Sequence, residues 1–165
     1  DAEKSAWLNQ QHLLKLDSTA FAEAARPFVE KAGLPIDDRY PAAAAAVQEK
    51  VRLLSEVPGA LDFLLLDEIS IDEGALAKVA KNDAAKDLLL TLASAFEAAG
   101  EWTADSAKEI IGSTAKANGA KPGQLMFPTR VALSGKGGGP DLGDILVLLG
   151  QAKSVARVRA LGEQL

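Results

Sequence analysis

The chain has 165 residues, a net charge of −5, 48% hydrophobic residues, one histidine and no cysteine. This composition excludes a disordered chain, which would be poorer in hydrophobic residues, and structural zinc sites, which need several converging nitrogen or sulfur ligands. No apolar run approaches the ~20 residues of a membrane helix, and the first residues lack the basic and apolar stretches of a signal peptide. We therefore expect a cytoplasmic, globular protein that does not bind membranes.

Apolar residues recur at helical spacing along nearly the whole chain, and period-two alternation is scarce. The series Ala85, Leu88, Leu89, Leu92 and Phe96 is one example. The sequence therefore predicts an all-α fold without a sheet. The predicted helices cover residues 2–15, 19–32, 38–56, 58–66, 72–80, 83–98, 103–118, 122–127, 128–134, 140–149 and 151–163.

Glycines and one capping residue mark several predicted helix ends. Gly33 and Gly100 follow helical stretches at positions where a left-handed residue is favoured, and Gly150 separates two further helices. Thr103 can cap the next helix, so we place a joint between two packed helical subdomains just after Gly100. The predicted domains are residues 1–100 and 101–165.

The charge is unevenly distributed along the chain. Residues 1–115 hold 11 basic and 20 acidic side chains, whereas residues 116–165 hold 7 basic and 3 acidic ones. No carboxylate occurs from Ile110 through Pro140. This asymmetry indicates an anionic partner for the C-terminal third, and chance clustering on a solvated face stays open as the alternative.

No pattern of catalytic residues emerges. No motif places a serine beside His12, which we interpret as a helix-surface or interhelix residue. The glycine-rich run Ser134–Pro140 fails the nucleotide phosphate-loop pattern, because Lys136 is followed by Gly137 and no strand precedes it. We interpret the run as a C-cap glycine with a linker, and a looser role in admitting a nucleic-acid base stays open. The sequence predicts no catalytic residue and no metal site in this chain.

Pro128 stands in the most informative segment. Proline lacks an N–H and disfavours helical dihedrals at Phe127, so we expect one helix to end and another to begin at Pro128. Arg130 would then lie in the first turn of a helix, where the macrodipole disfavours a cation. A partner outside the helix would offset that cost, and a guanidinium suits a base edge or a phosphate. An idle, exposed arginine stays the alternative.

Three stretches carry motifs of a known family. Residues 1–9 are similar to D-x-x-K-L-x-W-x-N, with Ser5 in place of the leucine, and residues 48–56 look like a helix that precedes a short turn started by proline. Residues 121–135 are similar to K-x-G-x-x-M-x-P-x-R-x-A-L-T-G, followed by G-P-x-L, and are the most specific of the three. Over essentially its whole length, the chain resembles the C-terminal anticodon-binding region of bacterial-type glutamyl-tRNA synthetases.

The resemblance implies the tRNA-reading end of a class I aminoacyl-tRNA synthetase, which uses ATP to attach glutamate to its tRNA. The partner would be the anticodon loop of tRNA(Glu) and not DNA. The ATP and Mg²⁺ sites would lie in an N-terminal catalytic domain of the same polypeptide, whose histidine-glycine and lysine-serine signature motifs are missing here. We therefore expect a truncated, monomeric chain without a cofactor or an active site of its own.

The resemblance also carries base-reading roles onto individual residues. Arg130 matches an arginine that reads the first anticodon base, while Gly139, Pro140 and Leu142 match the loop and helix start that pack around the first and middle bases. Lys50 matches a position that is often arginine and helps to read the third base; lysine keeps the charge and loses the bidentate fork. From charge alone we add, as possible phosphate contacts, Lys121, Lys136, Lys153 and Arg157.

A function of a different class stays open, namely a helical protein–protein interaction module or a duplicated family member that serves another partner. The acidic first two-thirds of the chain and the lack of a catalytic domain favour this alternative. It would be supported if the isolated domain recovered a protein and no tRNA.

Overall fold

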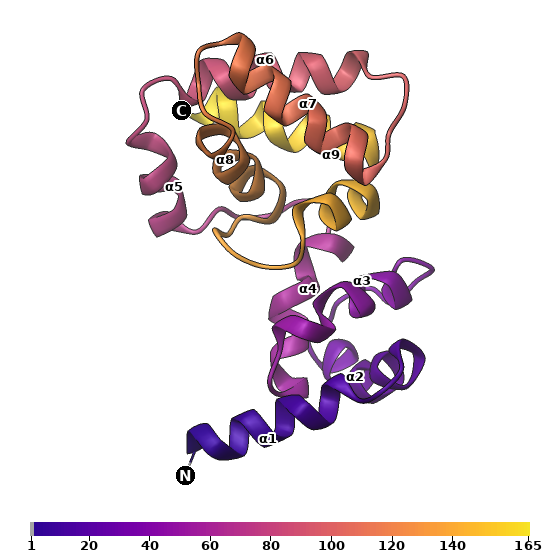
Figure 1. Ribbon diagram of the computed structural model, residues 1–165. Helices are drawn as coiled ribbons and strands as arrows, with labels where there is room; N and C mark the ends of the chain where they lie inside the picture. Colours follow the sequence, from indigo (N-terminus) through magenta and orange to yellow (C-terminus); the bar gives the residue numbers. More distant parts are fainter. Residues whose placement is uncertain (1) are drawn as a thin grey trace. The chain divides into compact units, whose positions relative to one another are not determined.

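The computed structural model describes residues 2–165, which form helices joined by turns and loops with no strand among them (Figure 1). The predicted all-α class is confirmed. The chain divides into two compact units, Asp1–Glu68 and Ile69–Leu165, which we call unit 1 and unit 2. Among the helices of the described part, none combines the length and the apolar content that a bilayer span requires.

Unit 1 is built around a small aromatic and aliphatic core. The side chains of Phe21, Tyr40, Leu61 and Phe63 are buried, and the hydroxyl of Tyr40 donates a hydrogen bond to the carbonyl of Ala22 at 2.6 Å. The polar tip of the tyrosine is therefore satisfied inside the core. The elements of this unit are α1 (Ala2–Leu14), α2 (Ser18–Lys31), α3 (Tyr40–Val47), the 3₁₀ turns η1 (Gln48–Lys50) and η2 (Leu54–Glu56), and α4 (Val57–Leu65).

The single predicted helix over 38–56 is wrong in its second half. The α-helix ends after eight residues, and the chain continues as the two 3₁₀ turns, with extended backbone at Val51 and Leu53. Glu56 Oε1 accepts hydrogen bonds from the backbone N–H groups of Arg52 and Leu53 at 2.7 and 2.8 Å. These bonds to a charged acceptor replace helical hydrogen bonds, a local competition that apolar spacing does not reveal.

Unit 2 packs around α6 and α9, which run side by side (Figure 1). The apolar face predicted for α6 is confirmed, because Leu89, Leu92 and Phe96 are buried. Gly150, with φ +82°, interrupts α9 and divides it into two helical segments, as predicted. The helices of this unit are α5 (Glu73–Ala80), α6 (Ala85–Ala98), α7 (Ala104–Ala117), α8 (Gly123–Ser134) and α9 (Leu142–Gln164).

The predicted division at residue 100 differs from the observed units, because this connection lies inside unit 2. The ring of Trp102 contacts Phe96 edge to face, with centroids 4.9 Å apart, and its Nε1 donates to the carbonyl of Leu146 at 2.9 Å. The side-chain amide of Gln151 donates to the carbonyl of Phe96 at 2.8 Å. These bonds satisfy the last carbonyls of α6 and of the first part of α9, so the connection is a packed corner.

The glycine and cap predictions have mixed outcomes. Gly33 has φ +78°, which confirms a left-handed residue after α2. Gly100 does not have a positive φ, so that prediction is wrong. The side-chain amide of Gln151 instead donates hydrogen bonds to the carbonyls of Phe96 and Ala99 at the end of α6. Thr103 caps α7 as predicted, since its Oγ1 accepts from the N–H of Ser106 at 3.0 Å.

Candidate functional site

Helix α8 runs without a break from Gly123 to Ser134, so the predicted helix boundary at Pro128 is wrong. A proline in a helix interior removes one backbone hydrogen bond and costs about 3 kcal/mol or more. Here Pro128 is buried, and the removal of its apolar ring from water offsets part of that cost. Arg130 consequently lies in the helix interior, and the argument from the dipole of a helix start does not apply to it.

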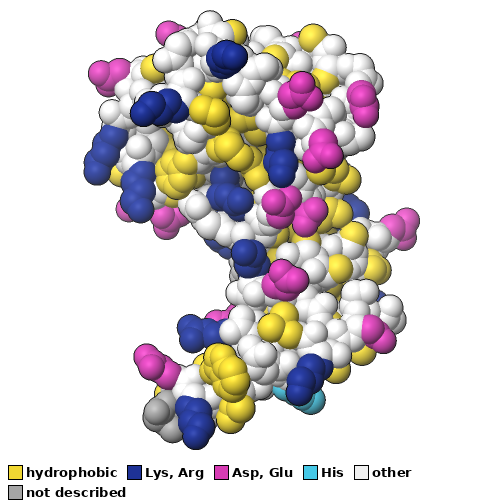
Figure 2. All heavy atoms as spheres, viewed as in Figure 1, with side chains coloured by type: hydrophobic (Ala, Val, Ile, Leu, Met, Phe, Trp, Pro, Cys, Tyr) yellow, Lys and Arg dark blue, Asp and Glu magenta, His cyan; other side chains and the backbone are white. Residues whose placement is uncertain are grey.

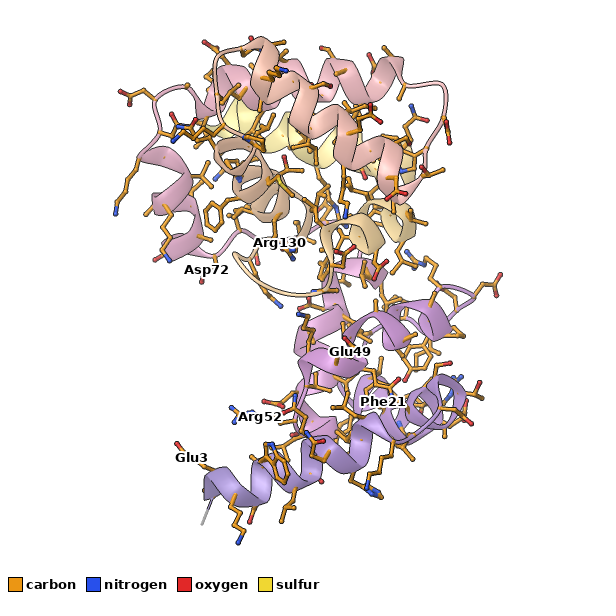
Figure 3. All side chains as sticks on the ribbon, in the orientation of Figure 1. Glu3, Phe21, Glu49, Arg52, Asp72 and Arg130 are labelled. Carbon is orange, nitrogen blue, oxygen red and sulfur yellow. The ribbon has the colours of Figure 1, made fainter. Side chains whose placement is uncertain are left out.

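The side chain of Arg130 reaches from α8 to the loop that leads into α9 (Figure 3). Its Nη1 donates to the carbonyl of Pro140 at 2.7 Å, and we call this contact the Arg130–Pro140 corner. The side chain is half-buried. This desolvation lowers the pKa of the Arg130 guanidinium, and the carboxylate of Asp141 raises it by less.

Within residues 2–165, no carboxylate comes within ion-pairing distance of Arg130. A guanidinium stays charged in proteins and carries several N–H donors in a planar fork. One donor is bound to the backbone, so the others are held in a fixed plane beside the loop. The corner is therefore a partly desolvated cation with hydrogen-bonding capacity left for a ligand.

The glycine-rich loop, Gly135–Gly139, begins at a C-cap of α8 that requires glycine. Gly135 has φ +81°, and a Cβ there would lie 2.2 Å from the carbonyl oxygen of Ser70. The N–H of Gly135 donates to the carbonyl of Val131 at 2.7 Å, and its own carbonyl accepts from the N–H of Asp72 at 2.8 Å. The start of the loop is thus fixed both by α8 and by the segment that enters α5.

The far end of the loop returns to Arg130 and enters α9. A Cβ on Gly139, which has φ +131°, would lie 3.8 Å from the guanidinium Nη1. Pro140 is buried, Asp141 caps α9, and the side chain of Leu142 is 4% exposed and anchors the first turn in the core. The structure therefore brings together four predicted residues: Arg130, Gly139, Pro140 and Leu142.

The four positions assigned to phosphates from charge alone differ in exposure. Lys121 and Lys136 are exposed, and Lys153 is half-buried. Figure 2 shows Lys and Arg side chains as a class on the visible face of unit 2. Arg157, however, is 8% exposed and its Nη1 donates to the carbonyl of Leu133 at 2.7 Å. A guanidinium that is buried and bound to a backbone carbonyl does not face a phosphate in solvent. Arg157 binds the last turn of α8 instead.

Lys50 lies in unit 1 as the last residue of η1, and its side chain is exposed. In the described part of the chain, neither a hydrogen bond nor an ion pair holds its ammonium group. The turn that follows is shaped by Glu56, whose carboxyl pKa is lowered by hydrogen bonds from the backbone N–H groups of Arg52 and Leu53. The backbone at this position is ordered by a carboxylate, while the lysine itself is free to move.

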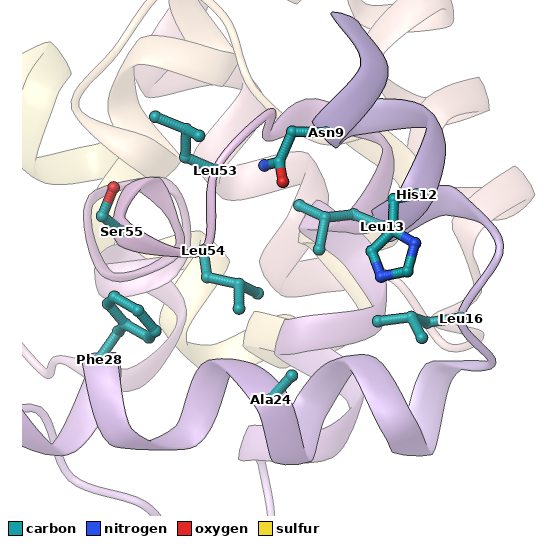
Figure 4. A pocket seen from close by; sticks show the side chains of 9 residues that line it. All are labelled: Asn9, His12, Leu13, Leu16, Ala24, Phe28, Leu53, Leu54 and Ser55. Atoms are coloured by element: carbon teal, nitrogen blue, oxygen red, sulfur yellow. The ribbon is translucent and has the colours of Figure 1, made fainter. Parts of the chain in front are cut away.

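A surface pocket of about 380 Å³ in unit 1 is lined by His12, the only histidine of the chain. Figure 4 shows His12 and Ser55 on opposite sides of this pocket, with Leu13 and Leu54 between them. His12 is exposed on α1, which confirms its interpretation as a helix-surface residue. Among residues 2–165, no cluster of three or more His, Asp or Glu side chains is arranged to hold a metal ion.

Comparison with known proteins assigns the chain to a family. A family model described as an anticodon binding domain matches residues 20–161. The chain belongs to this family. The glutamate–tRNA ligase of Akkermansia muciniphila is 42% identical over 160 residues, which are 97% of this chain and 36% of the relative. That of Thermobifida fusca is 33% identical over a match that covers 100% of this chain and 36% of the relative.

A solved structure supports the same assignment. The crystal structure of a glutamate tRNA ligase from Elizabethkingia meningosepticum, in complex with its amino acid, matches with a TM-score of 0.84 and 25% identity. The match covers 100% of this chain and 33% of that chain. The family resemblance found in the sequence is therefore confirmed, and this anticodon-binding domain spans about a third of the length of the relatives it matches.

Sequence reasoning missed two residues that shape the corner. The hydroxyl of Ser134 lies 2.9 Å from the carbonyl of Arg130 and 3.0 Å from that of Lys136, and the backbone N–H of Asp72 donates to the carbonyl of Gly135. A signal existed for Ser134, because a small hydroxyl residue directly precedes the C-cap glycine and matches a threonine of the family motif. No local pattern could have paired Asp72 with Gly135, since the contact joins distant segments.

Proposed function

We propose that this anticodon-binding domain recognises the anticodon loop of tRNA(Glu) as part of a glutamate–tRNA ligase. The observation that carries the proposal is the Arg130–Pro140 corner, in which a half-buried guanidinium is held 2.7 Å from a backbone carbonyl. Single-stranded RNA loops present unstacked bases, and a guanidinium fork offers paired donors to a base edge. Membership of the anticodon-binding family supports the same partner.

Within this proposal, Arg130 reads the first anticodon base, and the backbone around Gly139, Pro140 and Leu142 lies against the first and middle bases. Gly139 carries no side chain, which lets a base approach the backbone closely. The bond to Pro140 fixes the guanidinium before RNA arrives, so less side-chain entropy is lost on binding. A donor that is both fixed and partly desolvated discriminates more strongly between base edges than a solvated one.

The remaining cations take supporting roles in this proposal. Lys50 contributes to the third base, and Lys121, Lys136 and Lys153 contact phosphates, which adds affinity without sequence information. The domain acts as a monomer. The ATP and Mg²⁺ used for ligation of glutamate belong to the catalytic part of the ligase, outside this chain, so the domain supplies tRNA recognition and no chemical step.

The test is binding of the chain to the anticodon stem-loop of tRNA(Glu), compared with stem-loops in which one anticodon base is replaced. We expect replacement of the first base to cost about 1–3 kcal/mol, and affinity to fall with salt. A stem-loop with one inverted stem base pair is the matched control and should bind as well as the parent. Equal affinity for all anticodons overturns the proposal. Recovery of a protein and no tRNA would favour the protein–protein module instead.

A further inference from the structure

Ser134 lies in the last turn of α8, where its hydroxyl contacts both the helix and the glycine-rich loop. Its Oγ is 2.9 Å from the carbonyl of Arg130 and 3.0 Å from the carbonyl of Lys136, and it accepts from the N–H of Lys136 at 3.1 Å. The residue is 3% exposed. A hydroxyl has one proton to donate and lone pairs to accept, so Ser134 joins the helical turn of Arg130 to the first exposed residue of the loop.

The loop is attached to α8 at both of its ends. Where the loop leaves the helix, the hydroxyl of Ser134 contacts its backbone at Lys136. A Cβ on Gly137 would lie 3.0 Å from the ring of Phe127, so the chain runs closely over the helix. It then returns to Arg130, whose Nη1 binds the carbonyl of Pro140. The path between these two points determines where that carbonyl lies, and therefore how the guanidinium is turned.

Glycine makes this path easy to disturb. Four of the five residues from Gly135 to Gly139 are glycines, and glycine populates many backbone conformations at little cost. A loop of this kind does not hold one path by itself, so the bonds at its ends must select it, namely the backbone bonds of Gly135 and the side-chain bonds of Ser134 and Arg130. Loss of such a bond lowers the population of the binding-competent path, and the apparent affinity for a base that the corner recognises falls by the same factor.

The geometry points to Ser134 as a positioning residue for RNA recognition by this domain. Its hydroxyl sets the start of the loop and thereby orients the Arg130–Pro140 corner, while the buried side chain itself does not touch RNA. The inference rests on the proposed role of Arg130 at the first anticodon base. The threonine at the matching place of the family motif carries the same hydroxyl, which is the group the inference requires.

Ser154 provides a matched control within the same unit. Its side chain is 0% exposed, and its Oγ has no hydrogen-bond partner among the described residues. Ser154→Ala therefore removes an identical hydroxyl from the interior of unit 2 without touching the loop. An effect of Ser134→Ala that Ser154→Ala also produces would belong to general packing.

The experiment compares the wild-type chain with Ser134→Ala, Ser134→Thr and Ser154→Ala by two measurements. Amide hydrogen exchange at Lys136 reports the local bond, and the ratio of affinities for parent and first-base-replaced stem-loops reports recognition. We expect Ser134→Ala to accelerate the exchange and to lower the ratio, each by about fivefold, the equivalent of one ordinary hydrogen bond. Ser134→Thr should restore both values, and Ser154→Ala should change neither.

The outcomes separate this inference from the proposed function. A wild-type chain that discriminates between the stem-loops, together with a Ser134→Ala variant of unchanged ratio, overturns the positioning role alone. A wild-type chain without any discrimination overturns the proposed function, and the inference with it. Should Ser134→Ala lose its cooperative unfolding transition, Ser134→Cys keeps the side-chain size, weakens both hydrogen bonds and takes its place.

Discussion

Arg130 and Lys50 are the two cations that the family resemblance matches to anticodon bases, and their surroundings differ. Arg130 is half-buried in the interior of α8 and is bound to the carbonyl of Pro140, whereas Lys50 is exposed at the end of a 3₁₀ turn. A fixed, planar donor distinguishes one base edge from another, while a mobile ammonium mainly adds attraction to RNA. Two side chains of equal charge can therefore serve different roles when one is held by a hydrogen bond and the other is mobile.

The largest effect is expected from a substitution at Gly135, where the loop that leads to the Arg130–Pro140 corner begins. In Gly135→Ala, a left-handed residue acquires a Cβ that meets the backbone carbonyl of Ser70 at 2.2 Å, so we expect a loss of about 3 kcal/mol in the free energy of unfolding. Gly33→Ala in unit 1 is the control, because φ is +78° and nothing lies within 4 Å of the added Cβ; it should lose about 1 kcal/mol, the cost of the left-handed backbone alone. Urea unfolding measures both, and equal losses would contradict the restraint.

The next largest effect is expected from the two cations themselves. Arg130→Ala should weaken binding of the anticodon stem-loop by about 1–3 kcal/mol and reduce discrimination at the first base. Lys50→Ala should cost less than about 1 kcal/mol, because an exposed, mobile ammonium loses little on removal. Titration of both variants against parent and base-replaced stem-loops checks the contrast. A larger loss for Lys50→Ala would reverse the comparison between the two sites.

Phosphate contacts should separate from base contacts in their salt dependence. Lys121→Ala and Lys136→Ala should each weaken binding to all stem-loops alike and reduce the slope of log affinity against log salt by about 0.7. The anticodon preference should stay unchanged in both. Binding measured over a series of salt concentrations tests this. If a variant changed the anticodon preference as well as the salt slope, that lysine would contact a base and not only a phosphate.

The smallest expected effect concerns acid pH in unit 1. The pKa of Glu56 is lowered in the folded chain by hydrogen bonds from Arg52 and Leu53, so its carboxylate stabilises the fold above the unfolded pKa, and this contribution is lost as pH falls through the folded pKa. Glu56→Gln should therefore lower stability slightly at neutral pH and flatten its decline in acid. Thermal unfolding of both chains from pH 7 to pH 3 measures the difference. Parallel curves would show that this carboxylate does not order the turn.

Periodic apolar residues made the helices predictable, because burial of Leu89, Leu92 and Phe96 follows directly from their spacing. The errors arose where a side chain binds a backbone group, because the periodic spacing of apolar residues gives no sign of such a bond. Glu56 binds the backbone N–H groups of Arg52 and Leu53 within the helix predicted over residues 38–56, and Gln151 binds carbonyls at the end of α6, inside unit 2. The Glu56 bonds are local and the Gln151 bonds depend on tertiary placement, and apolar spacing discloses neither kind.

At the candidate site, Arg130 was selected both by the family motif and by a local physical argument, and the local argument rested on a wrong premise. The dipole argument selected Arg130 on the premise of a helix start at Pro128, and α8 continues through that proline. The motif also grouped Arg130 with Pro140, to which it is hydrogen-bonded, and with the neighbouring Gly139. Burial of Arg157 was missed, because charge along the chain does not tell which cations face the core.

The hydrogen bond from the N–H of Asp72 to the carbonyl of Gly135 has a consequence for dissecting the protein. Every helix of unit 2 begins at or after Glu73, so a fragment cut there would keep all of them. It would nevertheless lack the donor that closes the loop start and the carbonyl of Ser70 that lies over it. A minimal fragment should therefore start no later than Ile69, because the irregular residues that precede α5 hold the start of the glycine-rich loop.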